Sequence, residues 1–298
     1  MGQLSLSEIS YRLRGQGLRL VTGPFAFRIS SRLNEIAATL HTLYGDFPLA
    51  PEGDFIDFHV RIRLSSGIRR AYRTQSIFDL DGVTPFKPLP GKQAFALLEW
   101  GMNWCIYSHA HHFLIIHGAI LERDGCTILI PAPSGSGKST LCAALMCRGW
   151  RLLSDELILI EPKTGLAYPL CRPVSLKNQS IAVLQAFEPD AFITKPIPDT
   201  SKGTVAHMRP TTESVLLANT PGKPKLVIFP RYRAGSKTTL SPLRKSEVFM
   251  SLVENAFNYS LLGSTGFSTL TNLVDHSNGF FAEYSSLEEV IAHINDLA

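Results

Sequence analysis

The chain has 298 residues, of which 45% are hydrophobic and 18% charged, and its formal net charge is +4. This composition is typical of a folded globular protein and excludes a disordered chain. The charge is too small to favour a nucleic-acid partner. No apolar run could span a bilayer, and the N-terminus lacks the pattern of a secretory signal. The five cysteines form no C-x-x-C pair, so we expect a cytoplasmic protein with no membrane partner.

Residues 1–92 predict a small N-terminal α+β module that is mostly β. Its clearest strand covers 56–65, where apolar and polar residues alternate. The other expected elements are strands at 18–21, 25–29 and 68–73 and a helix over 31–44 capped by Ser30 or Ser31. The stretch 84–91 has three prolines and a glycine and is expected to lead into a second domain, 93–298.

The basic excess of the chain lies in the first 95 residues, which hold 12 Lys/Arg against 8 Asp/Glu. Five arginines cluster there, at positions 61, 63, 69, 70 and 73. We attribute them to a solvated sheet face rather than to a site for an acidic partner.

The second domain is predicted to begin with an apolar helix over 93–110 that leads into His109, His111 and His112. Three histidines within four residues suggest a metal site. They lack a carboxylate or cysteine at ligand spacing, so packed or solvated histidines are the expected interpretation.

Residues 117–130 form two apolar runs joined by Asp124-Gly125, which is a strong hairpin signal. The strand entering the following loop should therefore pair antiparallel with the strand before it. A dinucleotide-binding fold would place a parallel crossover at this point. The pattern favours an α/β kinase built on a mixed sheet.

The segment 132–140, A-P-S-G-S-G-K-S-T, fits the phosphate-binding loop pattern with Ala132 in place of the first glycine. It lies between a strand-length apolar run and a helical pattern that ends at Gly149. Loop amides and the helix start would hold phosphate oxygens of ATP. Lys138 would reach the β- and γ-phosphates, and the Ser139 hydroxyl would bind Mg²⁺. The predicted nucleotide-binding residues are Pro133, Ser134, Gly135, Ser136, Gly137, Lys138, Ser139 and Thr140.

Asp155 and Glu156 follow a short strand, 17 residues after Lys138, and should return to the edge of the sheet that carries the loop. A carboxylate near the loop serine would complete the magnesium shell, so Ser139 and Asp155 are the predicted metal ligands. An acid is also needed to accept the proton of a hydroxyl acceptor. Neighbouring strand residues point to opposite faces, so both acids serve one site only if the strand has ended. We favour Asp155 as the functional acid.

Residues 162–225 show little periodicity, and we expect long loops there. Arg172, Lys177, Lys202, His207 and Arg209 are expected as a group on the acceptor side, where phosphate charge needs neutralising. Beyond them, strands are expected at 226–229 and 280–284, and helices at 247–258, 263–273 and 286–297, the last opened by a capping box at Ser286.

These motifs resemble the kinase domain of HPr serine kinase/phosphorylase and, within that superfamily, the HPr-kinase-related group called kinase A. The resemblance is carried by His117-Gly, Asp124-Gly, 132–140, Arg148-Gly and 153–155, and more loosely by 172–178, 202–207 and 229–232. It implies a P-loop kinase core of the HPr kinase/PEP carboxykinase type that uses ATP and Mg²⁺.

The same resemblance implies an active-site role for His117, and metal binding and a catalytic base for Asp155 and Glu156. The superfamily has two aspartates at this place, so Glu156 departs from it and the identity of the base stays open. The acid followed by Arg-Gly that the parent enzyme has downstream is absent from the sequence. This departure weakens the case for phosphorolysis and for the carrier protein HPr as the acceptor, and it leaves open whether any phosphorolysis occurs.

The sequence thus predicts an ATP-dependent kinase that transfers phosphate to a hydroxyl, most plausibly a serine of a protein or peptide. Its predicted catalytic residues are Asp155, Glu156, His117 and Lys138. A small-molecule kinase with the same core, and a switch that binds ATP without transfer, are the alternatives. Whether the chain also pairs with copies of itself is left open.

Overall fold

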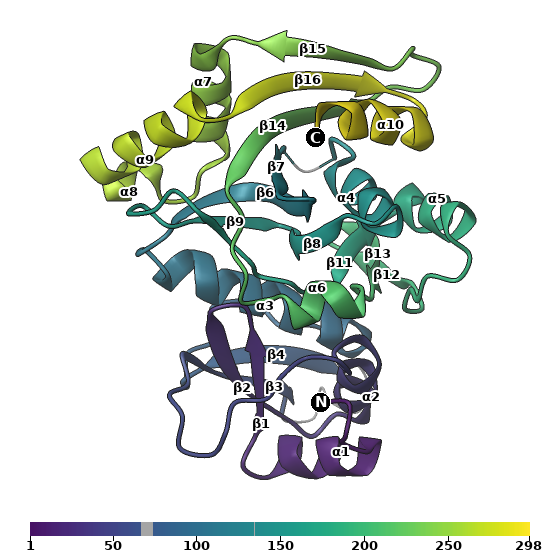
Figure 1. The fold of residues 1–298 in the computed structure, drawn as a ribbon. Helices are drawn as coiled ribbons and strands as arrows, with labels where there is room; N and C mark the ends of the chain where they lie inside the picture. The colour runs from purple at the N-terminus through teal and green to yellow at the C-terminus, as the bar shows by residue number, and fades with distance from the viewer. Residues whose placement is uncertain (67–73, 134) are drawn as a thin grey trace.

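The computed structural model describes residues 1–66, 74–133 and 135–298. Within these residues the chain forms sheets of five, eight and three strands with helices packed around them (Figure 1). The predicted α/β class with a mixed sheet is confirmed. The strand expected at 68–73, three of the five clustered arginines and Ser134 lie outside the described residues.

The five-stranded sheet and two helices make up most of the N-terminal module. Its strands lie in the order β1-β2-β3-β4-β5, with β2 and β3 parallel. The elements are α1 (Leu6–Arg14), β1 (Leu18–Thr22), β2 (Phe25–Ser31), α2 (Asn34–Leu43), β3 (Phe58–Leu64), β4 (Gln75–Leu80) and β5 (Leu89–Pro90). The three predicted strands that are described are confirmed, whereas α1 was not predicted. The predicted cap at Ser30 or Ser31 is wrong, because β2 continues to pair with β3 through Ser31 and the helix begins at Asn34.

Helix α3 (Ala94–His109) confirms the helix expected at 93–110 and lies between the N-terminal sheet and the larger sheet (Figure 1). It packs on β3, β4 and α2, and most of its residues are buried. The predicted domain boundary at 92/93 stays a prediction. Although α3 lies within the predicted second domain, one of its sides therefore packs on the N-terminal module.

The eight-stranded sheet contains the predicted hairpin. Its strands are β6 (Leu114–Arg123), β7 (Cys126–Pro131), β8 (Arg151–Ser154), β9 (Leu157–Ile160), β10 (Ala167–Tyr168), β14 (Pro224–Tyr232), β15 (Thr239–Leu243) and β16 (Asn278–Tyr284). Strands β6 and β7 pair antiparallel through a turn in which Asp124 and Gly125 both have positive φ, 50° and 75°. Strand β7 also pairs with β14 in parallel, so the sheet is mixed as predicted.

Helices cover both faces of this sheet. On one face lie α4 (Lys138–Cys147) and α10 (Leu287–Leu297), and on the other α7 (Lys245–Asn255), α8 (Tyr259–Leu262) and α9 (Ser264–Asp275). Residues of β6 alternate between the two layers: Ala119 shares a core cluster with Leu141 of α4, and Ile120 shares another with Val248 of α7. This double cover explains why β6 and β7 are nearly continuous apolar runs.

Residues 162–225 are not the long loops that we expected. They form β10, β11 (Val174–Lys177), α5 (Gln179–Phe187), β12 (Ile197–Thr200), β13 (Gly203–Met208) and α6 (Thr212–Leu216). Strands β11, β13 and β12 make the three-stranded sheet, which packs beside α4 together with α5. The prediction failed because these elements are short and α5 buries only Leu184, so apolar periodicity is weak.

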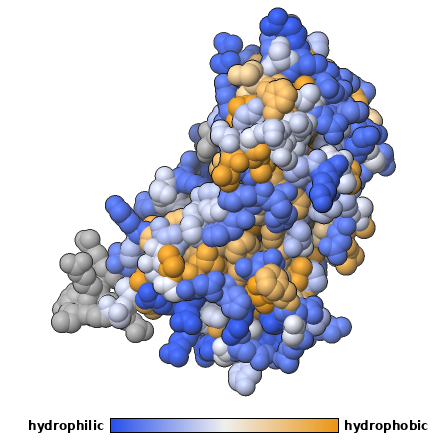
Figure 2. All heavy atoms as spheres, turned by 90° about the vertical axis from the view of Figure 1, so that its left-hand side faces the viewer, coloured by the Kyte–Doolittle hydropathy of each residue, from blue (hydrophilic) through white to orange (hydrophobic). Residues whose placement is uncertain are grey.

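Figure 2 views the side of the molecule on which α8 and α9 lie, and shows apolar atoms there in several groups separated by hydrophilic ones. Met250, Leu261 and Phe267 contribute exposed apolar side chains on α7, α8 and α9. In the described part of the chain, no helix combines the length and apolar character needed to cross a membrane.

Candidate active site

The loop between β7 and α4 has the backbone geometry of an anion-binding turn. Gly135 and Gly137 have φ of 92° and 93°, a region that residues with a Cβ rarely adopt. Gly137 caps α4, and its carbonyl accepts the first helical hydrogen bond, from Leu141 N at 3.0 Å. The free amides and the partial positive charge of the helix start therefore converge on the cavity in front of the loop.

The Asp155 carboxylate lies against the start of α4, as the spacing predicted. Its Oδ1 accepts hydrogen bonds from Lys138 Nζ at 2.7 Å and Ser139 Oγ at 3.2 Å, and its Oδ2 accepts one from the Ser175 N–H at 3.2 Å. Lys138 and Asp155 are both buried. Burial lowers the Lys138 pKa, but the charges of Asp155 and Glu156 outweigh it and hold that pKa above its ordinary value. Lys138 is therefore a permanent cation.

A backbone bend sends Glu156 in a different direction from Asp155. Strand β8 ends at Ser154 and β9 begins at Leu157, and Glu156 between them has φ 83°. Its Oε2 lies 3.1 Å from His117 Nε2, and its Oε1 accepts a hydrogen bond from Lys177 Nζ at 3.0 Å. The strand has therefore ended where the sequence analysis required it to end if both acids are to serve one site.

Glu156 is ionised in this environment. Burial alone would raise its pKa, but Lys138, the hydrogen bond with His117, Lys177 and Lys202 together hold the pKa well below its ordinary value. The carboxylate is thus a fixed negative charge that faces a histidine and ammonium groups.

A cavity of about 1030 Å³ opens in front of the loop and contains most of the predicted site. Of the predicted residues it is lined by His117, Pro133, Gly135, Gly137, Lys138, Ser139 and Thr140. Lys177 and Lys202 line it as well, as do Val183 and Phe187 of α5 on one wall. Glu156 is joined to the cavity through His117 and Lys177.

Two tyrosines on this cavity were not predicted as site residues. Tyr232 ends β14 and Tyr284 ends β16, and their rings lie 6.0 Å apart. A Cβ on Gly137 would lie 3.1 Å from the Tyr284 hydroxyl oxygen. The only sequence signal for them was the run 229–232, because the parallel pairing of β14 with β16 joins residues more than fifty positions apart.

The residues present fit a magnesium–nucleotide complex. The buried Ser136 hydroxyl has no hydrogen-bond partner among the described residues, and neither has Ser175 Oγ, which lines the cavity. Ser139 and Asp155 provide two adjacent oxygen ligands, and Mg²⁺ commonly takes one or two such ligands with substrate phosphates completing its shell. No cluster of three His, Cys, Asp or Glu that could hold a metal occurs in the described ranges.

The five basic residues expected on the acceptor side divide into two sets. Lys177 and Lys202 line the cavity. The predicted placement of Arg172, Arg209 and His207 on the acceptor side is wrong. Arg172 is buried in an ion pair with Glu99 of α3, Arg209 pairs with Asp46, and the buried His207 ring packs on Phe95. Burial lowers the His207 pKa, so this ring is neutral. Arg172 and His207 therefore attach to α3, and Arg209 joins the second domain to the N-terminal module.

His109, at the end of α3, and His112, just after it, pack against aromatic rings. His109 Nδ1 lies 2.9 Å from the Cys105 carbonyl oxygen, and its ring meets Phe58 at 5.9 Å. The His112 ring lies 4.4 Å from that of Phe113.

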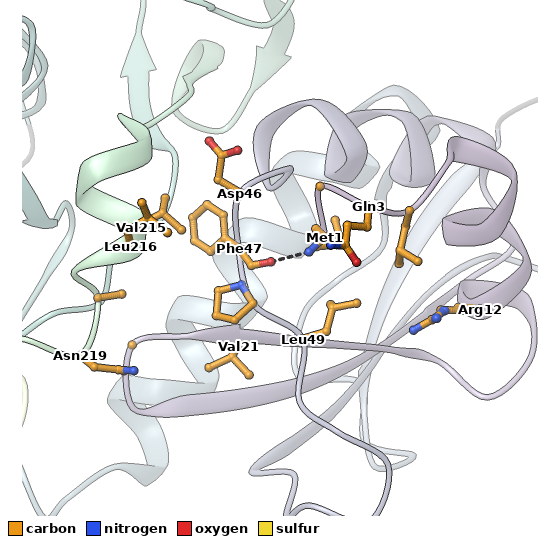
Figure 3. A pocket seen from close by; sticks show the side chains of 15 residues that line it. Met1, Gln3, Arg12, Val21, Asp46, Phe47, Leu49, Val215, Leu216 and Asn219 are labelled. Atoms are coloured by element: carbon orange, nitrogen blue, oxygen red, sulfur yellow. Dashed lines mark hydrogen bonds between the residues drawn. The ribbon is translucent and has the colours of Figure 1, made fainter.

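A second cavity, of about 610 Å³, lies where the N-terminal module meets α6 (Figure 3). Its lining includes Met1, Arg12, Asp46, Phe47 and Leu216. The Met1 amine donates to the Phe47 carbonyl at 2.7 Å, and the Asp46 carboxylate is already bonded to Arg209 and Thr212. None of the predicted site residues is among the residues that line this cavity.

Three comparisons relate the chain to known proteins. A family model described as SynChlorMet cassette protein ScmC matches residues 93–172. Proteins named HPr kinase/phosphorylase from three strains of Streptococcus thermophilus are each 31% identical over 75 residues, which is 25% of this chain and 24% of each relative. The solved structure of the Hpr(Ser) kinase/phosphatase from Coxiella burnetii matches with a TM-score of 0.29 and 15% identity, over 61% of this chain and 96% of that one.

The chain therefore spans about a quarter of the length of the curated relatives it matches. Over that quarter, the resemblance to the HPr kinase/phosphorylase superfamily is confirmed. The narrower kinase A grouping stays a prediction.

Proposed function

We propose that this HPr kinase-like chain is an ATP-dependent kinase that transfers the γ-phosphoryl group to the hydroxyl of a serine in a protein or peptide. The observation that carries the proposal is that the neighbouring acids Asp155 and Glu156 contact different sets of residues. Asp155 is hydrogen-bonded to Lys138 and Ser139, where metal and phosphates would bind. Glu156 is hydrogen-bonded to His117 and Lys177. A phosphotransferase needs both a metal ligand and a proton acceptor, and here one bend supplies the two at adjacent positions.

Each residue has a role that follows from its contacts. Lys138 and the loop amides bind and orient the phosphates, and Ser139 with Asp155 would hold magnesium. Glu156 accepts the proton of the acceptor hydroxyl while His117 and Lys177 hold its two oxygens in place. ATP with Mg²⁺, when bound, supplies the transferable phosphoryl group and charge neutralisation.

We therefore assign the base to Glu156, a question that the sequence left open. All three partners of Asp155 donate to it, and two of them belong to the phosphate loop and α4. The Asp155 carboxylate is therefore engaged on the side where the metal would bind. A low pKa at Glu156 suits this chemistry, because phosphoryl transfer relies mainly on positioning and the base must be ionised when the hydroxyl arrives.

The test is transfer of label from γ-labelled ATP with Mg²⁺, offered in parallel to lysate proteins and to a metabolite pool. We expect label in protein. Glu156→Gln should keep ATP affinity but lose transfer by about a hundredfold or more, the usual contribution of a general base. Lys138→Ala should lose ATP binding and serves as the binding-deficient control.

The outcomes separate the alternatives. Label only in metabolites supports the small-molecule kinase, and ATP binding with no labelled product of either kind supports the switch. Transfer by Glu156→Gln at the wild-type rate removes Glu156 as the base.

A further inference from the structure

One face of α3 is joined to the active site at both ends. Trp100, Asn103 and Tyr107 are three and four positions apart, so they share a side of the helix, and each is half-buried. At one end, the Lys202 ammonium lies 5.2 Å from the centre of the Trp100 ring. At the other end, the Tyr107 ring stacks on Phe257 with 4.7 Å between centroids and 9° between planes. Both contacts involve exposed side chains of the second domain.

Both partners of this face lead directly to Glu156. The Phe257 ring lies 6.1 Å from that of His117, which contacts Glu156. Lys202 lines the same cavity as His117, and its charge acts on Glu156. Trp100 and Tyr107 are seven residues apart, about 10 Å along a helix axis. That distance is spanned by about three residues of an extended peptide.

Lys202 is held in place by its turn rather than by an ion pair. Thr200 Oγ1 donates to the Gly203 carbonyl at 2.6 Å and accepts from Lys202 N at 3.1 Å. The amide of Gln93, just before α3, donates to the Asp199 carbonyl at 2.9 Å. No described carboxylate forms an ion pair with Lys202, in contrast to Lys177. Partial burial lowers the Lys202 pKa and nearby Lys177 and Lys138 lower it further, although Glu156 opposes them, so an incoming carboxylate would stabilise its charge.

We propose that the acceptor serine is presented by an extended peptide segment that runs between Lys202 and Phe257, the two exposed side chains that α3 supports through Trp100 and Tyr107. An acidic side chain of that segment pairs with Lys202. An apolar side chain, about three residues away on the other side of the serine, packs on Phe257 and Tyr107. The acceptor is thus an acidic–apolar serine peptide, a substrate class that rests on the kinase activity proposed above.

The experiment uses the full chain, γ-labelled ATP with Mg²⁺ and a positional-scanning library of serine-centred peptides. The readout is the ratio of label in acidic to label in basic peptides at each position, taken within each variant so that changes in overall rate cancel. Wild type should favour Asp or Glu on one side and Leu or Phe on the other by about tenfold. Lys202→Glu should reverse the charge preference, and Phe257→Ala should remove the apolar one.

Two matched control variants carry the same kinds of substitution at positions away from the proposed peptide site. Lys163→Glu reverses an exposed lysine in the β9–β10 turn, at the far end of β9 from Glu156, and Phe267→Ala removes an exposed phenylalanine of α9. Neither should change either ratio.

Several results would overturn the proposal. Equal labelling of all flanking sequences, or preferences that Lys202→Glu and Phe257→Ala leave unchanged, exclude this peptide site while the proposed kinase activity stands. Label in small hydroxyl compounds but in no peptide excludes the peptide site and also the protein or peptide acceptor proposed above, while ATP-dependent transfer stands. Absence of label in every acceptor, with ATP bound normally, removes the kinase activity itself and the proposal with it.

Discussion

Two neighbouring carboxylates differ in what they touch because of one backbone angle. The position of Asp155 beside the phosphate loop could be predicted, because one helix and one turn after the loop return the chain to the same sheet edge. The separate direction of Glu156 could not be predicted, since a positive φ of 83° at a non-glycine residue has no sequence signal. The bend is stabilised by tertiary contacts, including the hydrogen bond from Gly118 N to the Glu156 carbonyl at 3.2 Å.

The depressed pKa of Glu156 makes a prediction about stability and pH. A carboxyl whose folded pKa lies below its unfolded value of 4.5 contributes stability that is fully present above pH 4.5 and is lost as the pH falls through the folded pKa. The difference in free energy of unfolding between wild type and Glu156→Gln should therefore be constant from pH 6 to 8 and change in favour of the variant below pH 4.5. Urea denaturation at several pH values measures it.

The control for this prediction is Glu254→Gln, which removes an exposed carboxylate of α7 with the same change in charge. Its difference from wild type should vary less with pH. A Glu156→Gln difference that is the same at pH 7 and pH 3.5 contradicts the depressed pKa.

At the scale of elements, sequence patterns worked where the contacts were local. The β6–β7 hairpin, the phosphate loop and α4 follow one another along the chain, so turn residues and periodicity predicted them. The elements in 162–225 are held by non-local contacts instead. Strand β11, for example, pairs with β13 from about thirty residues later. The cavity wall that these elements form could therefore not be derived from periodicity alone.

The two ends of α4 allow a test of what the loop glycines do. Gly137 and Gly149 both have positive φ, 93° and 87°, but a Cβ on Gly137 would meet Tyr284 Oη at 3.1 Å, and one on Gly149 would meet nothing within 4 Å. Alanine at either position should cost about 1–2 kcal/mol of stability through backbone strain. Only Gly137→Ala should also weaken ATP binding, by about tenfold, because it distorts the amides that face the phosphates.

Urea denaturation and a titration with a fluorescent ATP analogue separate the two effects, with Gly149→Ala as the matched control. Equal ATP affinity in both variants would mean that the loop amides do not bind the phosphates.

At the scale of the whole molecule, buried polar contacts join α3 both to the N-terminal module and to the rest of the second domain. Arg172, just before β11, donates to Asn103 Oδ1 at 2.7 Å and pairs with Glu99, and the Tyr44 hydroxyl donates to Glu99 at 2.6 Å. The sequence analysis placed Arg172 on the acceptor side, because a basic residue in an apparent loop is typical of phosphate binding. Its partner Glu99 is 73 positions away, so only the folded chain reveals the pair.

Breaking the buried pair of Arg172 and Glu99 should strongly lower stability. Although burial lowers the Arg172 pKa, Glu99 and Tyr44 hold it above its ordinary value, so the guanidinium stays charged next to the carboxylate. Arg172→Met leaves Glu99 buried without its partner and should cost about 3–5 kcal/mol of stability. Replacing both residues, as Arg172→Met with Glu99→Gln, should recover part of that loss. Arg244→Met, which breaks a solvent-exposed pair with Glu247, should leave the denaturation midpoint nearly unchanged.

Measurement of transfer in the same variants distinguishes a structural role from a catalytic one. Because Arg172 contacts α3 between Trp100 and Tyr107, its loss should loosen the helix face that supports Lys202 and Phe257 and raise KM for peptide more than it lowers kcat. If Arg172→Met kept full stability and lost only kcat, Arg172 would instead act on the acceptor side, as the sequence analysis expected.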